Sequence, residues 1–225
     1  MKKFSVIALA GLGLLLASCN NKKADEAKTS TEQTVAEKKG SMFAVDAAAS
    51  KVQWRAFHKG GFAPRWGELK ITTGELTVDN NMLTSGEFVI DMNSLTVDPA
   101  SVTEKDKKYT DLEGHLKSKD FFDTANNPTA DFKITKVEDL ATAPSDAVQG
   151  ANKTVSGNLT LLGKTMNVTF PAKVTMSETN VEMMAKFTVN RADWGIKFGT
   201  DETDPAEWAI SKDIEISVDV KAMKK

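Results

Sequence analysis

Few residues of this chain carry side chains that could catalyse a reaction or hold a metal ion. The sequence contains two histidines, His58 and His115, and one cysteine, Cys19. A zinc site would need mostly carboxylate ligands, which suit zinc poorly, and the G-x-S-x-G pattern of α/β-hydrolases does not occur. Plentiful Asp and Glu leave open a carboxylate pair for glycoside hydrolysis, although nothing marks out two of them. We therefore expect no catalytic residue, no metal and no cofactor.

The stretch from Gly157 to Thr165, GNLTLLGKT, looks like a phosphate-binding loop. Five residues separate its two glycines, whereas the nucleotide-binding motif has four at that place. The stretch also falls in a predicted β-hairpin, whereas a phosphate-binding loop joins a strand to a helix. Gly163 is therefore predicted to be a turn residue.

The balance of charges argues against a nucleic-acid partner. The formal net charge is −2, and residues 1–18 hold Lys2 and Lys3 but no acid. Without them, 27 basic side chains stand against 31 acidic ones, a net charge of −4. Because proteins that bind nucleic acid need a basic surface, we expect no such partner.

The first 18 residues have the features of a secretory signal peptide. Lys2 and Lys3 precede the apolar run from Val6 to Ala17, which is too short to cross a bilayer as a helix. The run ends in Leu-Ala-Ser-Cys, which resembles the lipoprotein box of bacteria and implies that Cys19 receives a diacylglyceryl group and further acyl chains such as palmitate. The alternative is an incidental cysteine behind an ordinary signal peptide.

The lipoprotein box also implies a location. Two or more acyl chains, at about 0.8 kcal/mol per buried CH₂, anchor a protein stably in a membrane. Asn20 follows the cysteine, and by resemblance to bacterial lipoprotein sorting this favours the outer membrane of the cell envelope. Since Cys19 is the only cysteine, the chain has no internal disulfide.

Residues 20–41 are predicted to be a disordered tether. They contain one strongly apolar residue, Val35, among many Lys, Glu, Thr and Ala. Such a segment cannot bury enough apolar surface to become ordered. We therefore divide the chain into a signal peptide (1–18), a lipidated cysteine with a disordered tether (19–41) and one domain (42–225).

From Met42 onward, apolar and polar residues alternate with the period of a β-strand. Val52, Trp54 and Ala56 begin the pattern, and Ile214 to Val220 ends it. About eight strands follow from this alternation, together with one helical insertion between residues 96 and 119, for which Ser101 is the predicted N-cap with Glu104 three residues on. The pattern predicts an all-β barrel or sandwich. A closed barrel of eight strands is either filled by side chains or holds one small ligand, and periodicity alone leaves these alternatives open.

The insertion leads into a stretch that combines a histidine with two adjacent phenylalanines, His115, Phe121 and Phe122. His115 has two interpretations. It either bonds a backbone carbonyl or Asp120 and fixes the insertion to the barrel, or orients a lipid head group at the barrel mouth. Adjacent residues of an extended chain point to opposite faces, so both phenylalanines can face inward only where the backbone is irregular.

Arg191, Asp193 and Trp194 form a second group of candidate site residues. The simpler interpretation is a local ion pair between Arg191 and Asp193 under an aromatic lid. Alternatively, Arg191 meets a pyrophosphate, whose oxygens its planar guanidinium suits. Met183 and neighbouring methionines would give either a soft lining for a flexible ligand or ordinary core packing.

Several motifs in order resemble the YceI-like family. They are FAVD at residues 43–46, the run from Asp111 to Phe132, the hairpin from Gly157 to Val174, and FTVNRADWGIKFG at residues 187–199. The segment from Thr96 to Gly114 departs from the pattern, because DKKYTDLEG replaces a shorter Arg-Asp run. The resemblance implies an eight-stranded antiparallel, lipocalin-like barrel with one helical insertion, which holds a long isoprenoid lipid.

We therefore expect an envelope lipoprotein that sequesters or transports a long apolar lipid, of polyisoprenoid or quinone type. A solid-core structural or interaction lipoprotein is the alternative, and a hydrolase is a weaker one. A homodimer is left open. The residues expected to contact the lipid are Trp54, Phe88, His115, Phe121, Phe122, Phe132, Phe170, Met183, Phe187, Arg191 and Trp194.

Overall fold

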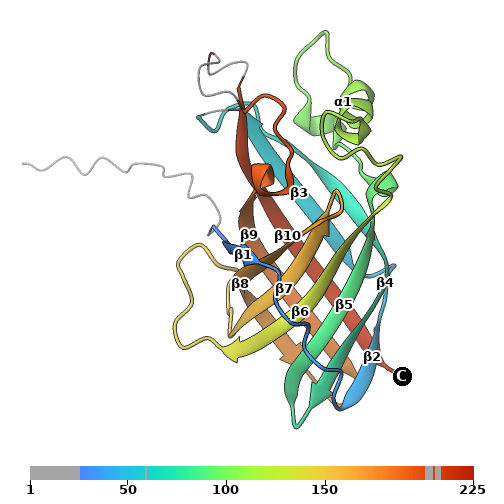
Figure 1. Cartoon of the computed structure of the whole chain (residues 1–225), viewed down its shortest axis with the longest axis vertical. Coiled ribbons are helices and arrows are strands. Elements are labelled where there is room, and N and C mark those ends of the chain that lie inside the picture. Colours follow the sequence, from blue (N-terminus) through green and yellow to red (C-terminus); the bar gives the residue numbers. More distant parts are fainter. Residues whose placement is uncertain (1–25, 59, 201–204, 206–208) are drawn as a thin grey trace, which may run out of the picture.

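The computed structural model describes residues 26–58, 60–200, 205 and 209–225 (Figure 1). The predicted signal peptide, the predicted lipidation site at Cys19 and the first residues of the predicted tether lie outside this part of the chain. Within it, no helix has the length and apolar character needed to cross a membrane.

Eight long strands form a closed antiparallel barrel, which confirms the predicted fold class. Each strand pairs with the next along the chain, and the last pairs with the first to close the wall. The strands are β3 (Lys51–His58), β4 (Arg65–Asp79), β5 (Met82–Asp91), β6 (Thr129–Asp139), β7 (Lys153–Leu161), β8 (Lys164–Met176), β9 (Asn180–Asn190) and β10 (Ile210–Lys224). A shorter strand, β2 (Ser41–Val45), pairs with β4 and β10 beyond the start of β3 and so shares its place in the wall.

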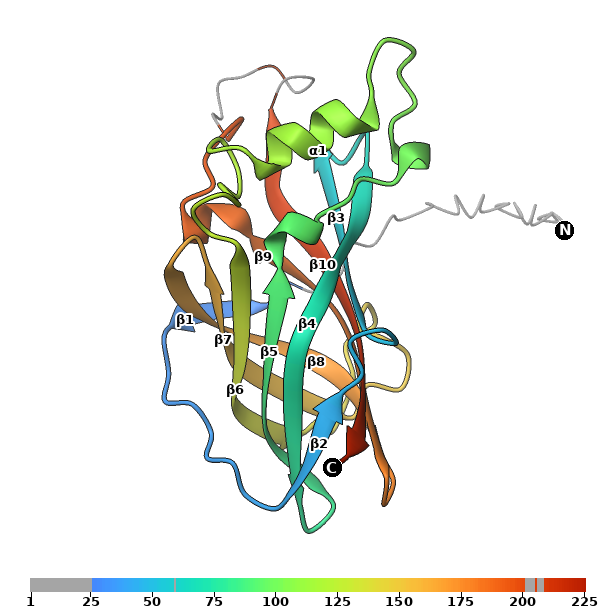
Figure 2. The same ribbon diagram turned by 90° about the vertical axis from the view of Figure 1, so that its right-hand side faces the viewer.

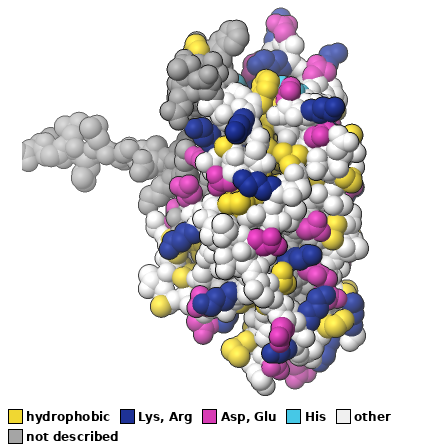
Figure 3. Space-filling view, in the orientation of Figure 1, with side chains coloured by type: hydrophobic (Ala, Val, Ile, Leu, Met, Phe, Trp, Pro, Cys, Tyr) yellow, Lys and Arg dark blue, Asp and Glu magenta, His cyan; other side chains and the backbone are white. Residues whose placement is uncertain are grey.

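Alternation along each strand separates the barrel interior from its surface. In β9, for example, Met183 and Phe187 are buried, whereas Glu182 and Met184 are exposed. On the outside, Figure 3 shows positive and negative side chains interspersed over one face of the barrel. The apolar residues of all eight strands therefore meet in one interior, as the period of two predicts.

Two positions of the predicted hairpin, Gly163 and Gly157, have surroundings that favour glycine. Leu162 and Gly163 have φ angles of 50° and 70°, which is the geometry of a two-residue hairpin turn and not of a phosphate-binding loop. Gly157 lies beneath the ring of Phe132, because a Cβ on this glycine would stand 2.2 Å from the Phe132 Cζ. The small residue lets a large aromatic side chain of β6 lie flat against β7.

The insertion lies across one end of the barrel, and the C-terminus lies at the other end (Figure 2). It contains a short 3₁₀ turn, η2 (Pro99–Ser101), and the helix α1 (Tyr109–Lys117), and another 3₁₀ turn, η1 (Met92–Ser94), precedes it at the end of β5. The prediction of Ser101 as the helix N-cap is wrong, because the helix begins eight residues later, after Lys108. Instead, the Asp98 side chain accepts a hydrogen bond from the Ala100 N–H and caps η2.

Residues 26–40, which we call the N-terminal strap, are ordered against the outside of the barrel, so the prediction of a disordered tether is wrong from Glu26 onward. The strand β1 (Lys28–Thr31) pairs antiparallel with residues 166–169 of β8. The strap then runs along the outer wall to β2 (Figure 2). The Gln33 N–H donates to the Asn158 Oδ1 at 3.0 Å, and the Asn158 amide donates back to the Gln33 carbonyl at 2.7 Å.

Farther along the chain, the strap also bonds to the neighbouring strands β6 and β5. The Ala36 N–H donates to the Ile134 carbonyl of β6 at 3.0 Å, and the Thr84 hydroxyl of β5 donates to the Lys39 carbonyl at 2.9 Å. Composition did not predict this order because little apolar burial is involved: Ala27 is the one buried residue of the strap. Hydrogen bonds to the main chain of the strap hold the segment instead, together with ion pairs from Lys38 to Glu75 and Glu87.

Candidate functional site

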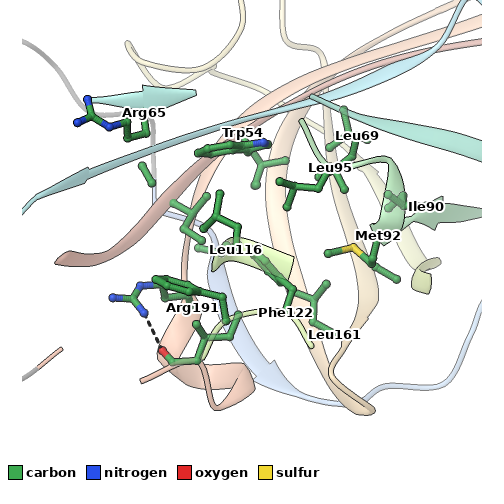
Figure 4. A pocket seen from close by; sticks show the side chains of 18 of the residues that line it. Trp54, Arg65, Leu69, Ile90, Met92, Leu95, Leu116, Phe122, Leu161 and Arg191 are labelled. Carbon is green, nitrogen blue, oxygen red and sulfur yellow. Dashed lines mark hydrogen bonds between the residues drawn. The ribbon is translucent and has the colours of Figure 1, made fainter. Parts of the chain in front are cut away.

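The interior of the barrel encloses a cavity of about 470 Å³. All eight barrel strands line it, and the insertion covers its end with Leu112, Leu116 and the residues after α1. Figure 4 shows Leu116 and Phe122 facing Trp54 across this space, with Leu69 and Met92 beside it. The lining is overwhelmingly aliphatic and aromatic, which suits an apolar ligand.

A row of aromatic rings forms one wall of the cavity. Phe88 stacks on Phe132 with ring centroids 6.1 Å apart, and Phe132 lies 5.8 Å from Phe170. Phe170 and Phe187 are stacked almost parallel at 4.0 Å. These four predicted residues come from β5, β6, β8 and β9, and they line the cavity together with Met183, another predicted residue.

Phe121 and Phe122 both line the cavity, although they are adjacent in the sequence. The chain is not extended here. The Phe121 N–H and the Asp123 N–H both donate to the Ser118 carbonyl, at 3.1 and 2.8 Å, and Asp123 has a φ of 40°. The irregular backbone that both inward-facing rings require is therefore present.

His115 lies at the cavity mouth and is held by its neighbours. Its Nε2 lies 2.9 Å from the Asp120 Oδ2, which is the local hydrogen bond that the structural interpretation predicts. Its ring meets those of Phe121 and Phe198 edge to face, with centroids 5.0 and 4.9 Å apart. The side chain thus ties α1 both to the turn that follows it and to the segment after β9.

Arg191 is buried, with 2% of its surface exposed, and it bonds backbone carbonyls. The donor-to-acceptor distances are 3.0 Å to Ser211, 3.1 Å to Ile196, 2.8 Å to Phe198 and 3.3 Å to Ile210. The predicted ion pair with Asp193 is not formed, because the guanidinium points to these carbonyls. Burial lowers the pKa of Arg191 to about 10, so the group remains charged at neutral pH.

The guanidinium carbon of Arg191 lies 5.7 Å from the centre of the Phe121 ring. A cation over an aromatic face is attracted by the ring electrons. Arg191 also contributes to the cavity lining, so a buried positive charge lies among mostly apolar residues. The hydrogen bonds from the Arg191 side chain to backbone carbonyls join the end of β9 to the start of β10 and to the segment between them.

A family model described as the YceI-like domain matches residues 43–222. The chain belongs to the YceI-like family. Among curated relatives, a UPF0312 protein of Pseudomonas paraeruginosa is 29% identical over 126 residues, which are 53% of this chain and 57% of that protein. The chain therefore spans little more than half of that relative.

Solved structures show the same YceI-like fold. BcnA of Burkholderia cenocepacia superposes with a TM-score of 0.56 at 21% identity, over 79% of this chain and 99% of that one. A polyisoprenoid binding domain from Saccharophagus degradans, implicated in plant cell wall breakdown, superposes with a TM-score of 0.54 at 16% identity, over 81% and 98%. At these identities the similarity shows the fold alone.

Both predicted tryptophans of this YceI-like barrel line the cavity with their rings, and both indole N–H groups are satisfied. The Trp54 Nε1 donates to the Thr96 carbonyl at 3.2 Å, and the Trp194 Nε1 donates to the Leu159 carbonyl at 3.0 Å. Buried tryptophan requires such a partner. The two residues therefore present only apolar surface to a ligand.

The mouth of the YceI-like cavity has a charged rim that sequence reasoning missed. Asp106, Lys107, Lys108 and Asp111 of the insertion line it, together with Arg65 of β4. The Arg65 guanidinium forms an ion pair with Glu104. The sequence did contain a signal for this rim. The basic-acidic run DKKYTDLEG, which departs from the family pattern, includes all four rim residues of the insertion. Among the described residues, no group of three His, Cys, Asp or Glu could hold a metal ion.

Glu104 fixes the insertion to the barrel wall. A hydrogen bond from its own backbone, together with those from Arg65 and Lys107, lowers the pKa of Glu104 from 4.5 to about 2, against the opposing effect of burial. A lowered pKa means that the contact stabilises the fold above pH 4.5 and loses this effect as pH falls towards 2. The Arg65–Glu104 ion pair should therefore persist at neutral pH.

We expect Glu104→Gln to loosen residues 99–108. Hydrogen–deuterium exchange at pH 7 should show about two- to fivefold lower protection there, since a partly exposed ion pair contributes at most about 1 kcal/mol. Glu138→Gln, which removes the exposed partner of Lys136, is the matched control and should leave the insertion unchanged. Equal protection in both variants would mean that Glu104 does not hold the insertion.

Proposed function

We propose that this YceI-like protein binds a long apolar lipid, of polyisoprenoid or quinone type, inside its barrel. The observation that carries the proposal is the cavity of about 470 Å³ with its aliphatic and aromatic lining. Transfer of apolar ligand surface from water into such a site is favourable by about 25 cal/mol per Å². The similar fold of a domain named for polyisoprenoid binding supports the same ligand class.

Polar groups sit at the mouth and at Arg191, while the middle of the barrel is apolar. A lipid with one polar end and a long hydrocarbon tail matches this distribution, because few polar contacts are needed to set its orientation. The function would then be sequestration or transport, with no bond made or broken. A barrel packed solid with side chains, the main alternative, is disfavoured by the cavity itself.

We further propose that the protein is anchored in the bacterial cell envelope. The signal-peptide pattern of residues 1–18 and the lipoprotein box at Cys19 support an acylated N-terminus, and Asn20 supports the outer membrane. Mass spectrometry of the N-terminal peptide from membranes should find acyl chains on Cys19. An unmodified cysteine, or a protein that stays soluble after cell fractionation, would contradict the anchor.

Native mass spectrometry tests the ligand. The chain from Asn20 onward, exported to the periplasm, should carry one lipid per barrel, and organic extraction should release a molecule with the repeating mass of isoprene units. The same spectrum reports whether the protein is a monomer or a homodimer. A bare barrel that stays bare after incubation with prenyl alcohols and quinones would overturn the proposal.

A tryptophan in the cavity should block binding. Met183 is 1% exposed and lines the cavity, so Met183→Trp should lower quinone affinity at least tenfold and destabilise the fold by about 1–3 kcal/mol. Met184→Trp, one residue on but 41% exposed at the surface, is the control and should bind as the parent does. Equal affinity in the two variants would place the ligand elsewhere.

A further inference from the structure

The wall of the barrel divides between β8 and β9. These strands pair from Met176↔Val181 up to Ala172↔Ala185, and above that pair β8 bonds to β1 instead. We call this divided part the β8–β9 fork. At its upper end, the Trp194 indole bonds the Leu159 carbonyl at 3.0 Å and so joins the segment after β9 to β7. The fork is therefore a gap in the β-ladder that is bounded at both ends.

The N-terminal strap fills the fork. The Ala27 N–H donates to the Thr188 carbonyl of β9 at 2.8 Å, and Glu26 forms a parallel bridge with Thr188. On the other side, Lys28 to Thr31 pair with β8. The strap thus completes the wall by bonding to both separated strands, with the Ala27 side chain buried in the core.

A pair of stacked rings lies between the lower part of the fork and the cavity. Phe170 and Phe187 are the first inward-facing residues above the Ala172↔Ala185 pair, one on each strand, and their rings are stacked at 4.0 Å. Both rings line the cavity. Displacement of the strap would leave the side chains of Phe170 and Phe187, with Val168 and Val189 above them, between the outside and the ligand space.

The strap is attached to the described wall with little burial of apolar surface. Of residues 26–40, Ala27 is buried, Thr29 and Ala36 are half-buried, and the others are exposed. Segments with few buried apolar contacts open locally at a low free-energy cost. The mouth, by contrast, is covered by the insertion. The Thr96 and Asp98 N–H groups hold the insertion to the Glu68 and Trp66 carbonyls of β4 at 3.0 and 2.9 Å, and the Arg65–Glu104 ion pair adds to these bonds.

We propose that the β8–β9 fork is a lateral portal, through which an apolar lipid enters or leaves the cavity when the N-terminal strap detaches. This inference rests on the proposed lipid-binding function. Under the anchor proposed above, only residues 20–25 separate Cys19 from the strap, so the portal would face the membrane that supplies the lipid. An apolar chain that uses this route avoids the charged rim of Asp106, Lys107, Lys108 and Asp111.

A disulfide across the portal tests the proposal. Lys28 and Thr169 are opposite residues of the antiparallel β1–β8 pair, and opposite Cα atoms in such a pair lie at a distance that a disulfide can span. In a chain from Asn20 onward, which keeps every described contact and omits Cys19, Lys28→Cys with Thr169→Cys supplies the only two thiols. The control is Lys173→Cys with Met184→Cys, an exposed opposite pair of β8 and β9 below the fork.

The measurement is uptake of a tetraprenyl benzoquinone from phosphatidylcholine vesicles, followed by quenching of Trp54 and Trp194, which line the cavity. We expect the oxidised Lys28–Thr169 variant to take up quinone at least tenfold more slowly than its reduced form. The reduced form and both forms of the control should match the parent chain.

The outcomes separate the two proposals. An oxidised portal variant that takes up quinone as fast as its reduced form overturns the portal and leaves lipid binding intact. A parent chain whose tryptophans remain unquenched at equilibrium overturns the proposed function, and the portal with it. Slowed uptake with unchanged quenching at equilibrium supports both, because the lock then affects the route and not the site.

Discussion

A chain that starts at Met42 should unfold more easily than one that starts at Asn20, by about 3–5 kcal/mol at roughly 1 kcal/mol per lost hydrogen bond. The deletion removes the β1–β8 ladder, the paired bonds between Gln33 and Asn158, and the bond from Ala36 to Ile134. It also uncovers the fork in the barrel wall. Urea unfolding followed by tryptophan fluorescence measures the difference.

The buried Asn158 adds to this expected loss. It is 3% exposed, and it accepts a hydrogen bond from Asn167 at 3.0 Å beneath the strap. A chain that starts at Glu26 keeps all described contacts, so it is the matched control and should be as stable as the longer chain. Equal stability of the chains from Glu26 and Met42 would contradict a structural role of the strap.

Arg191→Met should destabilise the barrel by about 3–5 kcal/mol, because it leaves buried carbonyls without donors. Four bonds from this side chain connect residues 196 and 198 with residues 210 and 211. Methionine fills a similar length but donates nothing. Thermal unfolding of the purified protein gives the loss, and exchange protection should fall first in residues 195–200.

Two comparisons make the Arg191 result specific. Arg55→Met removes an exposed guanidinium that lies over the Phe57 ring at 5.1 Å, and it should cost less than about 1 kcal/mol. Arg191→Lys keeps the charge but offers a single nitrogen in place of the planar fork, so it should lie between the parent and Arg191→Met. An Arg191→Met protein as stable as Arg55→Met would mean that these bonds contribute little.

The barrel could be predicted from the sequence because alternation reports which face of a strand is buried. Trp54, Phe88, Phe170 and Phe187 each occupy an inward position of a clear alternating run, and each lines the cavity. Periodicity could not show that the interior is hollow, since a filled core and a cavity need the same pattern. Whether the barrel is filled or hollow depends on the total volume of the inward side chains of all eight strands, compared with the space that the strands enclose.

Two of the errors, the strap and Arg191, arise from bonding to main-chain atoms. The strap is held by its peptide groups, and Arg191 is held by carbonyls of residues that any side chain could occupy. The helix start was misplaced for another reason, because the Asp98 side chain and Pro99 stabilise a separate short turn that ends at Ser101. Composition and spacing describe side chains, so they carry little information on such contacts.

The order of the strap has a consequence for how far the protein can reach. For a chain anchored through Cys19, seven residues lead to Glu26, and seven residues span at most about 25 Å. The barrel would then rest beside its own membrane with the β8–β9 side close to it. Release of residues 26–40 would add about 50 Å of chain. With the strap bound, the barrel could collect lipid from the bilayer that anchors it. With the strap released, the barrel could deliver that lipid farther from this bilayer. Neutron reflectometry on supported bilayers would detect the change in the height of the barrel.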